Sequence, residues 1–427
     1  MHLLRLLHER GMINRPLFRP MRGIRTEPPL FRVSLDATRE EGSHGYAAYT
    51  GGFAATFSEE ESWSKAIGEM LERSLLAAPA GAMTRASLND LHHQGDAALD
   101  SSSLPGFLPF QDASIPERWR SPEEALEWVE AKQLDGAPIL IPAQLAFWMY
   151  KRAAPEPLIQ RATTSGCAGG FTRDEAILGA LLEAIQRDGF LIYWLNGIAP
   201  RVIDIGSIEG RTKTFIESLR DAGLDPVFLD TTTDLSIPSC ACILRSHGAE
   251  PTIALGASAG FDIESTILHS ATEALSVFEY VARHPRYVLP AEYAPFTARD
   301  IRRDERLFAW KGAEMAERFA FFLAGERHAL ASFLPENLPS GSAAQLSFVL
   351  DRLRALGEGY EVIVYEIKNE LLDRLGYHVL RTIVPALMPL YLNEYAATLD
   401  CKRLREVPPA LGFEAAEHYT PWPHPFP

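Results

Sequence analysis

The chain has 427 residues, of which 47% are hydrophobic and 23% are charged. This balance is typical of a globular protein with a full core, and it excludes a disordered, collagen-like or disulfide-stapled chain. The 41 Lys and Arg residues face 56 Asp and Glu residues, which gives a net charge of −15. Because this surplus of negative charge opposes binding to a phosphate backbone, we expect no nucleic-acid partner.

Four cysteines are too few for a disulfide framework in a chain of this length, and we expect them to be reduced, buried thiols. They are Cys167, Cys240, Cys242 and Cys401. The charged start, MHLLRLLHERGM, has an apolar run too short for a signal peptide. No stretch approaches the roughly 18 apolar residues that span a membrane. The sequence therefore predicts a cytoplasmic protein without a membrane partner.

The first half of the chain alternates strands and helices around glycine-bearing segments. Residues 1–45 are basic and rich in proline, and are predicted to form an N-terminal extension ending in a strand, FRVSL. Residues 78–125 are rich in Ala, Pro, Gly and Ser, which predicts a loop-rich excursion. The other elements predicted in order are a strand (GGFAATF), a helix (WSKAIGEMLERSLL), a helix near SPEEALEWVEAKQL, a buried strand (APILIPAQLAFWMY), a turn (TTSGCAGG) and a long helix (FTRDEAILGALLEAIQRDGFLIYWL).

The second half continues this alternation and ends in a proline-rich tail. The predicted strands RVIDI, PVFLD, CACILRS and PTIALGAS precede a third long helix, FDIESTILHSATEALSVFEYVARH. A helix (SFVLDRLRALGEG) and the strands YEVIVYEI and YHVLRTIVPAL follow. The tail, residues 406–427, ends in HYTPWPHPFP, where alternating prolines exclude a helix. We expect an α+β or mixed α/β fold with one large domain over residues 46–405.

Two of the predicted helices repeat each other. AIGEMLER aligns without gaps to ALLEAIQR, with Ala, Glu and Arg at matching positions. In the first segment Glu69, Glu72 and Arg73 are spaced i, i+3 and i+4, so they project from one helical face. Glu183 and Arg187 keep the i, i+4 spacing in the second segment.

This repeat has two interpretations. The pairs are either ordinary surface Glu–Arg pairs, worth a few tenths of a kcal/mol each, or members of one site in which the carboxylates converge. Converging carboxylates hold Mg²⁺ together with substrate phosphates, and the arginines can take phosphate oxygens. Such a nucleotide site would need no P-loop, and the chain contains neither G-x-x-x-x-G-K-[ST] nor G-x-G-x-x-G.

Four segments in order resemble the YcaO superfamily, and in particular its azoline-forming cyclodehydratases. They are KAIGEMLER, TSGCAGGFTRDEAILGALLEAIQRDGF, VLRTIVPALMPL and the final PHPFP. The resemblance covers roughly residues 45–427. It implies a single large YcaO-type ATP-binding domain, of mixed α/β type and without a Walker motif, over residues 46–405.

The resemblance also implies the site residues, with ATP and Mg²⁺ as cofactors. The implied metal ligands are Glu69, Glu72, Glu183 and Glu273. The implied nucleotide-binding residues are Glu69, Glu72, Arg73, Glu183, Arg187 and Arg381. The tail prolines Pro423, Pro425 and Pro427 are implied to support catalysis, with Trp422 and Phe426 as apolar anchors that dock the tail near the nucleotide.

Three positions depart from the family pattern. Gln186 replaces a usual glutamate, which removes a metal ligand or leaves a neutral oxygen donor in its place. Gly189 stands where alanine is common, and we expect this change to be harmless. Ala386 replaces the glycine after Val-Pro.

The function implied by the resemblance is ATP-dependent conversion of Cys, Ser or Thr in a ribosomal precursor peptide to thiazoline or oxazoline. The implied partners in the bacterial cytoplasm are the precursor, a ThiF-like or winged-helix protein that binds its leader, and an FMN-dependent dehydrogenase. A homodimer is also conceivable. Alternatives are a YcaO-type thioamide-forming enzyme and an inactive scaffold subunit, the latter because of Gln186.

A different enzyme class is suggested by G-x-S-x-G at residues 256–260, between a predicted strand and a helix. This is the setting of a serine-hydrolase nucleophile elbow, with Ser258 as nucleophile. Downstream histidines that could complete a triad are His284, His328 and His378. A simple turn of small residues before the third long helix is the alternative explanation, and the one we favour.

Overall fold

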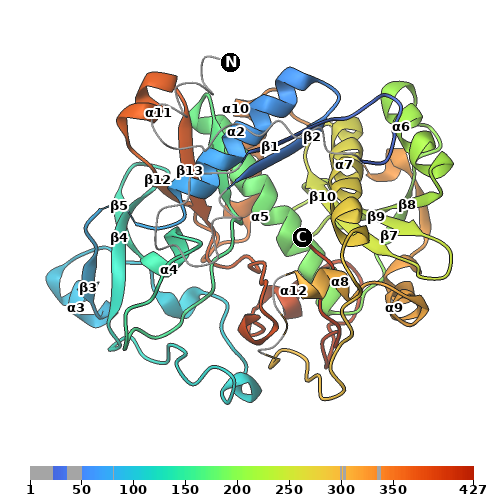
Figure 1. Cartoon of the computed structure of the whole chain (residues 1–427). Coiled ribbons are helices and arrows are strands. Elements are labelled where there is room, and N and C mark those ends of the chain that lie inside the picture. Colours follow the sequence, from blue (N-terminus) through green and yellow to red (C-terminus); the bar gives the residue numbers. More distant parts are fainter. Residues whose placement is uncertain (1–22, 36–50, 80, 299–300, 302–303, 334–337) are drawn as a thin grey trace.

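Two antiparallel-rich sheets flank a long central helix in the computed structural model (Figure 1). The structure describes residues 23–35, 51–79, 81–298, 301, 304–333 and 338–427, so most of the predicted N-terminal extension lies outside the described residues. The prediction of a mixed α/β fold in one large domain is confirmed. Within the described residues, no helix combines the length and the apolar character needed to cross a membrane.

The first sheet has six strands, five of which lie side by side in the order β3-β4-β12-β13-β6. Its strands are β3 (Thr84–Ala86), β4 (Leu126–Gln133), β12 (Ile363–Glu366), β13 (His378–Ile383) and β6 (Cys167–Gly170), with β5 (Pro138–Pro142) paired to β4. All of these neighbours are antiparallel.

The second sheet has five strands in the order β10-β9-β8-β7-β11, and a separate hairpin-like pair joins β1 to β2. The bounds are β7 (Arg201–Asp204), β8 (Leu224–Asp230), β9 (Ser239–Ser246), β10 (Ile253–Ala259), β11 (Arg327–Ala329), β1 (Phe31–Leu35) and β2 (Gly52–Thr56). Only the β11–β7 pair is parallel among the described strands. The four strands predicted between residues 201 and 258 are confirmed as β7 to β10.

Three long helices were predicted and all three are present. They are α2 (Glu59–Leu75), α5 (Arg173–Leu195) and α7 (Ile263–Ala282). Each begins at a side-chain cap, because Ser58, Thr172 and Asp262 accept a hydrogen bond from the backbone N–H three residues on. The remaining helices are α3 (Leu88–Gln94), α4 (Ala143–Ala146), α6 (Gly210–Asp221), α8 (Glu305–Phe308), α9 (Ala313–Phe319), α10 (Ser342–Ala355), α11 (Glu370–Leu375) and α12 (Arg403–Ala410).

Helix α5 lies between the two sheets and is buried along most of its length (Figure 1). In its first half Ile177 and Leu181 pack in one cluster with Leu380 of β13. In its second half Leu191 packs in another cluster with Ile243 of β9. A helix that is apolar over most of its surface belongs inside a protein, so the polar side chains of α5 extend from a backbone that is held in place.

Two predicted elements are wrong in part. The helix predicted near residues 121–134 is strand β4, which pairs with β5 and β12. Leu126 and Trp128 pack on one face of this strand, and Val129 and Ala131 pack on the other. The segment predicted as one buried strand from residue 137 to 150 ends as a strand at Pro142 and continues as α4. The predicted excursion at 78–125 contains β3 and α3 among its loops.

The proline-rich tail has no helix in its last residues, as predicted, and it is docked. Residues 423–426 are buried. The Trp194 indole N–H donates to the carbonyl of Trp422, and the ring of Phe426 lies 5.0 Å from that of Phe190. Both partners belong to α5, so the tail packs against the central helix.

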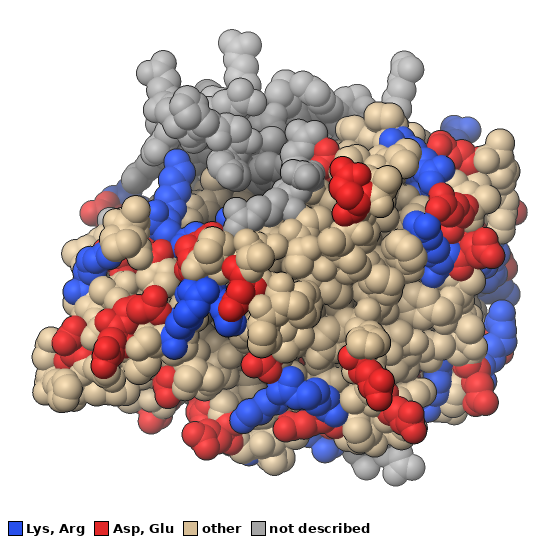
Figure 2. Space-filling view, turned by 90° about the horizontal axis from the view of Figure 1, so that it is seen from below, with Lys and Arg blue, Asp and Glu red and all other residues tan. Residues whose placement is uncertain are grey.

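Charged side chains on the lower face are interspersed, as Figure 2 shows for Lys and Arg against Asp and Glu. The net charge of −15 is therefore not gathered into a single acidic patch on this face. All four cysteines are free and buried, as expected.

A buried ion network fixes α5 to the end of the domain. Arg403 of α12 donates to both oxygens of Asp188, at 2.7 to 3.0 Å, and to Asp234 at 2.8 Å. The side chains of Arg403 and Asp188 are fully buried. Asp188 also accepts from the backbone N–H of Met388.

We predict that Asp188→Asn lowers the free energy of unfolding by about 3 kcal/mol, because it leaves the buried Arg403 short of a counter-charge. The control is Asp400→Asn, which breaks an exposed pair with Arg405 and should change stability by less than about 0.5 kcal/mol. Urea unfolding of both variants makes the measurement. Equal stability of the two variants would contradict this role for Asp188.

Candidate functional site

The first helix of the site is held against a glycine-bearing strand. A Cβ on Gly52 would lie 1.8 Å from the carbonyl oxygen of Ala66, so only glycine lets β2 approach α2 this closely. The approach brings the backbone N–H of Phe53 to the carboxylate of Glu69, at 2.5 Å. Glu69 also pairs with Arg73, at 2.7 Å.

Two further glutamates are fixed in the same manner by strand backbone. Glu72 of α2 accepts from the N–H of Gly169 in β6, at 2.8 Å. Glu273 of α7 accepts from the N–H of Ala257 in β10, at 2.7 Å. Three strand–helix pairs therefore each orient a carboxylate, two of them on α2 and one on α7.

The fourth carboxylate belongs to the central helix. Glu183 pairs with Arg187 at 2.6 Å, and Arg187 also donates to the hydroxyl of Ser165 at 2.6 Å. Both i, i+4 pairs predicted from the sequence are present, on α2 and on α5.

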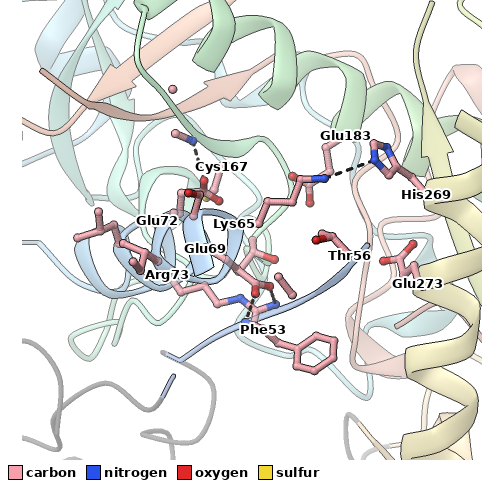
Figure 3. Close-up of a pocket in the computed structure, with 18 of the residues that line it drawn as sticks. Phe53, Thr56, Lys65, Glu69, Glu72, Arg73, Cys167, Glu183, His269 and Glu273 are labelled. Carbon is pink, nitrogen blue, oxygen red and sulfur yellow. Dashed lines mark hydrogen bonds and ion pairs between the residues drawn. The ribbon is translucent and has the colours of Figure 1, made fainter. Parts of the chain in front are cut away.

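One cavity of about 800 Å³ collects these groups (Figure 3). Its lining includes Glu69, Glu72, Arg73, Glu183, Gln186, Arg187 and Glu273. The two interpretations of the repeat are thereby separated: the pairs are not isolated surface pairs, because both line the same hollow between α2, α5 and α7.

Burial and mutual repulsion disfavour the charged forms of these carboxylates. Burial raises the pKa of Glu72 to about 8, and the neighbouring charges of Glu69 and Glu183 add to the rise. Burial likewise raises the pKa of Glu273 to about 7. Burial also raises the pKa of Glu183, against the opposing charge of Arg187. Without further positive charge the cavity is therefore a costly place for four carboxylates.

This donor set fits a divalent cation bound together with phosphates. The oxygens are hard ligands of the kind Mg²⁺ prefers, and their repulsion is relieved by a cation among them. Among the described residues, no three Asp, Glu, His or Cys side chains converge closely enough to hold a metal ion by themselves. Mg²⁺ commonly completes its ligand sphere with water and substrate phosphates, so a site shared with a nucleotide suits this arrangement.

Some cavity residues were missed by the sequence reasoning. Lys65 lies 2.9 Å from Glu61 and 3.4 Å from the ring of His269, and both Lys65 and His269 line the cavity (Figure 3). Burial lowers the pKa of His269 to about 4, helped by the charge of Lys65. The sequence spacing could have indicated both residues, because Lys65 precedes Glu69 by four residues and His269 precedes Glu273 by four, and residues four apart share a helical face.

Arg381 lies outside the main cavity. It is buried in β13 and donates to the carbonyl of Thr163 at 2.9 Å. It lines a smaller adjoining cavity of about 70 Å³, which it shares with Arg187 and Ser165. Arg187 lines both cavities.

The tail prolines also lie outside the lining of the main cavity. Pro423 and Pro425 are buried and Pro427 is half-buried. The tail reaches the site through one contact, because the guanidinium of Arg187 lies 5.8 Å from the ring centre of Phe426.

The structure does not favour Ser258 as a nucleophile. Ser258 lies within β10, paired with Cys240 of β9, and not at a turn into a helix. Two downstream histidines are engaged elsewhere, because His284 stacks on Phe308 and His378 lies 2.9 Å from Glu366. His328 lies in β11, at the opposite edge of the sheet from β10.

The departures from the family pattern have different consequences. Gln186 is buried and lines the cavity as an uncharged group. Gly189, which was expected to be interchangeable with alanine, is not so in this chain, because a Cβ there would lie 2.5 Å from the carbonyl oxygen of Thr231. Ala386 donates its N–H to Gly359, and its substitution for glycine has no evident effect.

A family model described as "YcaO cyclodehydratase, ATP-ad Mg2+-binding" matches residues 54–388. An uncharacterized protein of Methanothermobacter thermautotrophicus is 26% identical over 152 residues, which are 35% of this chain and 40% of that protein. The matched regions thus span about half or less of the curated relatives' lengths.

Solved structures share the fold. A heterocyclase in complex with substrate and cofactor aligns with a TM-score of 0.75 and 19% identity, over 99% of this chain and 57% of that one. YcaO from Methanopyrus kandleri bound with AMPPCP and Mg²⁺ aligns with 0.61 and 17%, over 90% of each chain. The E. coli microcin synthetase McbBCD complex with pro-MccB17 bound aligns with 0.58 and 14%, over 93% and 94%.

We predict that Glu72→Gln raises the free energy of unfolding of the ligand-free protein at neutral pH by about 1 kcal/mol. Burial and the neighbouring charges raise the pKa of Glu72 to about 8, so folding must protonate a carboxyl that is ionised in the unfolded chain, and glutamine avoids that cost. The glutamine oxygen can still accept from Gly169. Glu60→Gln, on the exposed face of the same helix, should have almost no effect. Denaturant unfolding without nucleotide tests this, and a less stable Glu72→Gln variant would contradict it.

Proposed function

The chain belongs to the YcaO family, whose members bind ATP and Mg²⁺, and we propose that it forms thiazoline or oxazoline rings in a ribosomal precursor peptide. The observation that carries the proposal is the cavity between α2, α5 and α7, whose lining includes four carboxylates and two arginines in a chain without a Walker motif. The similarity to heterocyclase structures supports the same activity at the level of the fold.

The proposed reaction activates a backbone amide. The side-chain sulfur or oxygen of a substrate Cys, Ser or Thr bonds to the carbonyl carbon of the preceding residue and gives a hemiorthoamide. The oxygen of that centre takes the γ-phosphoryl group of ATP, which leaves ADP. Phosphate then departs as the C=N bond forms and the nitrogen loses its proton, so each ring removes one water from the peptide.

The protein's part in this chemistry is positioning and charge compensation. Glu69, Glu72, Glu183 and Glu273 would hold Mg²⁺, which when bound would neutralise phosphate charge. Arg73 and Arg187 would orient phosphate oxygens through their planar donor groups. Arg381, one layer deeper, would support Arg187 from the adjoining cavity.

The proposed partners follow from the same assignment. The precursor peptide is the substrate, and a ThiF-like or winged-helix protein would bind its leader. An FMN-dependent dehydrogenase would oxidise the rings. Assembly with other proteins is supported by the similarity of this fold to a subunit of a microcin synthetase complex. A homodimer of this chain is part of the same proposal.

Glu69→Gln and Glu183→Gln should each weaken binding of a Mg²⁺–ATP analogue by about tenfold or more, because metal and phosphate would lose a fixed partner charge. The matched control is Glu217→Gln, which removes a glutamate from an exposed i, i+4 pair with Lys213. Isothermal calorimetry measures the affinities. Parental affinity in both cavity variants would overturn the assignment of the site.

Ser258→Ala should leave ring formation nearly unchanged, because Ser258 lies inside a strand and has no histidine partner among the described residues. Mass spectrometry of the precursor follows the loss of water per ring, and a coupled assay follows ADP. Labelling of Ser258 by an active-site serine probe, with peptide conversion independent of ATP, would instead establish a hydrolase.

A further inference from the structure

The docked tail is held by a buried arginine. Arg306 of α8 is fully buried, and its Nη1 donates to the carbonyl oxygens of His424, at 3.1 Å, and of Phe426. Nearby, the indole N–H of Trp310 donates to the carbonyl of Pro423 at 3.0 Å. Nη1 of Arg306 also lies 3.2 Å from Nδ1 of His424. Residues more than a hundred positions earlier in the chain therefore bind the tail through its backbone carbonyls and through the His424 imidazole.

The imidazole of His424 completes this attachment in its neutral form. Nε2 donates to the carbonyl of Tyr391 at 2.7 Å, and Nδ1 accepts from the N–H of Phe426 at 3.2 Å. Burial, with the positive charge of Arg306, holds the pKa of His424 far below its usual value. The carboxyl of Glu394 is also buried nearby, and the positive charge of Arg306 lowers its pKa against the larger effect of burial, which raises it.

At its end the tail meets the site at a single side chain. The ring of Phe426 lies 5.8 Å from the guanidinium of Arg187, within cation–π range. The other contacts of Arg187 are Glu183 and Ser165. No tail residue is among those that line the main cavity, and the structure links the tail to that lining through Arg187.

We propose that the tail acts as a support for Arg187, and that Arg306 is the positioning residue that holds the tail in place. Phe426 gives the guanidinium an apolar and polarisable face, which restricts it to the arrangement that Glu183 and Ser165 select. The tail thus affects the reaction through Arg187, and its prolines keep the segment extended at low entropic cost. The effect of the tail on ring formation rests on the proposed function, whereas the attachment of the tail by Arg306 does not depend on it.

The first test concerns the attachment. Arg306→Lys keeps the charge but loses the donor fork, and amide hydrogens of residues 419–427 should then exchange about tenfold faster by mass spectrometry. Exchange in the second half of α5 should stay slow. Arg318→Met is the control, because Arg318 stacks on Trp422 at 3.9 Å from the solvent side. Slow tail exchange in Arg306→Lys, or equal release in the control, would overturn the assignment of Arg306.

The second test is a double-mutant cycle on binding of a Mg²⁺–ATP analogue. Phe426→Leu should weaken binding about fivefold, and Arg187→Lys should weaken it more. If the tail acts through Arg187, the double variant binds no more weakly than Arg187→Lys alone. Additive losses would overturn the proposal.

Ring formation gives the third readout. In Arg306→Lys and Phe426→Leu, kcat should fall with the KM for peptide unchanged, and parental kcat with a released tail would overturn the proposal. Should the parent protein bind Mg²⁺–ATP but form no rings, the proposed function fails. The exchange and binding cycles would then still decide whether the tail supports Arg187.

Discussion

The structure depends on holding four carboxylates inside one cavity, which is unfavourable without compensating charge. Glu69, Glu72 and Glu273 cannot turn away, because each accepts a backbone N–H from a strand packed against its own helix. The repulsion is thereby preserved in the ligand-free fold instead of being relaxed by rotation of the side chains. If a cation and phosphates bind here as proposed, they would offset this repulsion, and the stability lost at the site would contribute to the affinity for the ligand.

Much of this arrangement could be predicted from the sequence. The three long helices have strong apolar periodicity, and the Glu–Arg spacing on α2 and α5 places the charged atoms on one face of each helix. Apolar periodicity does not show how these helices lie relative to one another. The convergence of the two pairs followed only from the resemblance to a family. Glu273 belongs to no repeat, and its place in the cavity depends on the packing of α7 on β10.

The failures have physical causes as well. The segment that forms β4 contains Glu, Ala, Lys and Gln, which favour helices, but its neighbours β5 and β12 offer backbone partners that local propensity does not anticipate. Arg381 belongs to a motif, yet β13 places it behind Arg187 and not in the main cavity. Gly189 looked exchangeable because the sequence cannot show that another segment approaches α5 within the radius of a methyl group.

Four consecutive residues of α5 show how closely fold and site are coupled. Arg187 faces the cavity, Asp188 anchors Arg403, Gly189 admits the Thr231 segment, and Phe190 packs on the tail. Consecutive residues of a helix point in directions about 100° apart, so the side chains of one turn can contact four different parts of the protein. A small rotation of this turn would move the arginine and disturb the ion network, the close approach and the tail together. Because most of α5 is buried between the two sheets, such a rotation is opposed by the surrounding core. The backbone of Arg187 is therefore fixed, and the contacts with Glu183 and Phe426 act on its side chain alone.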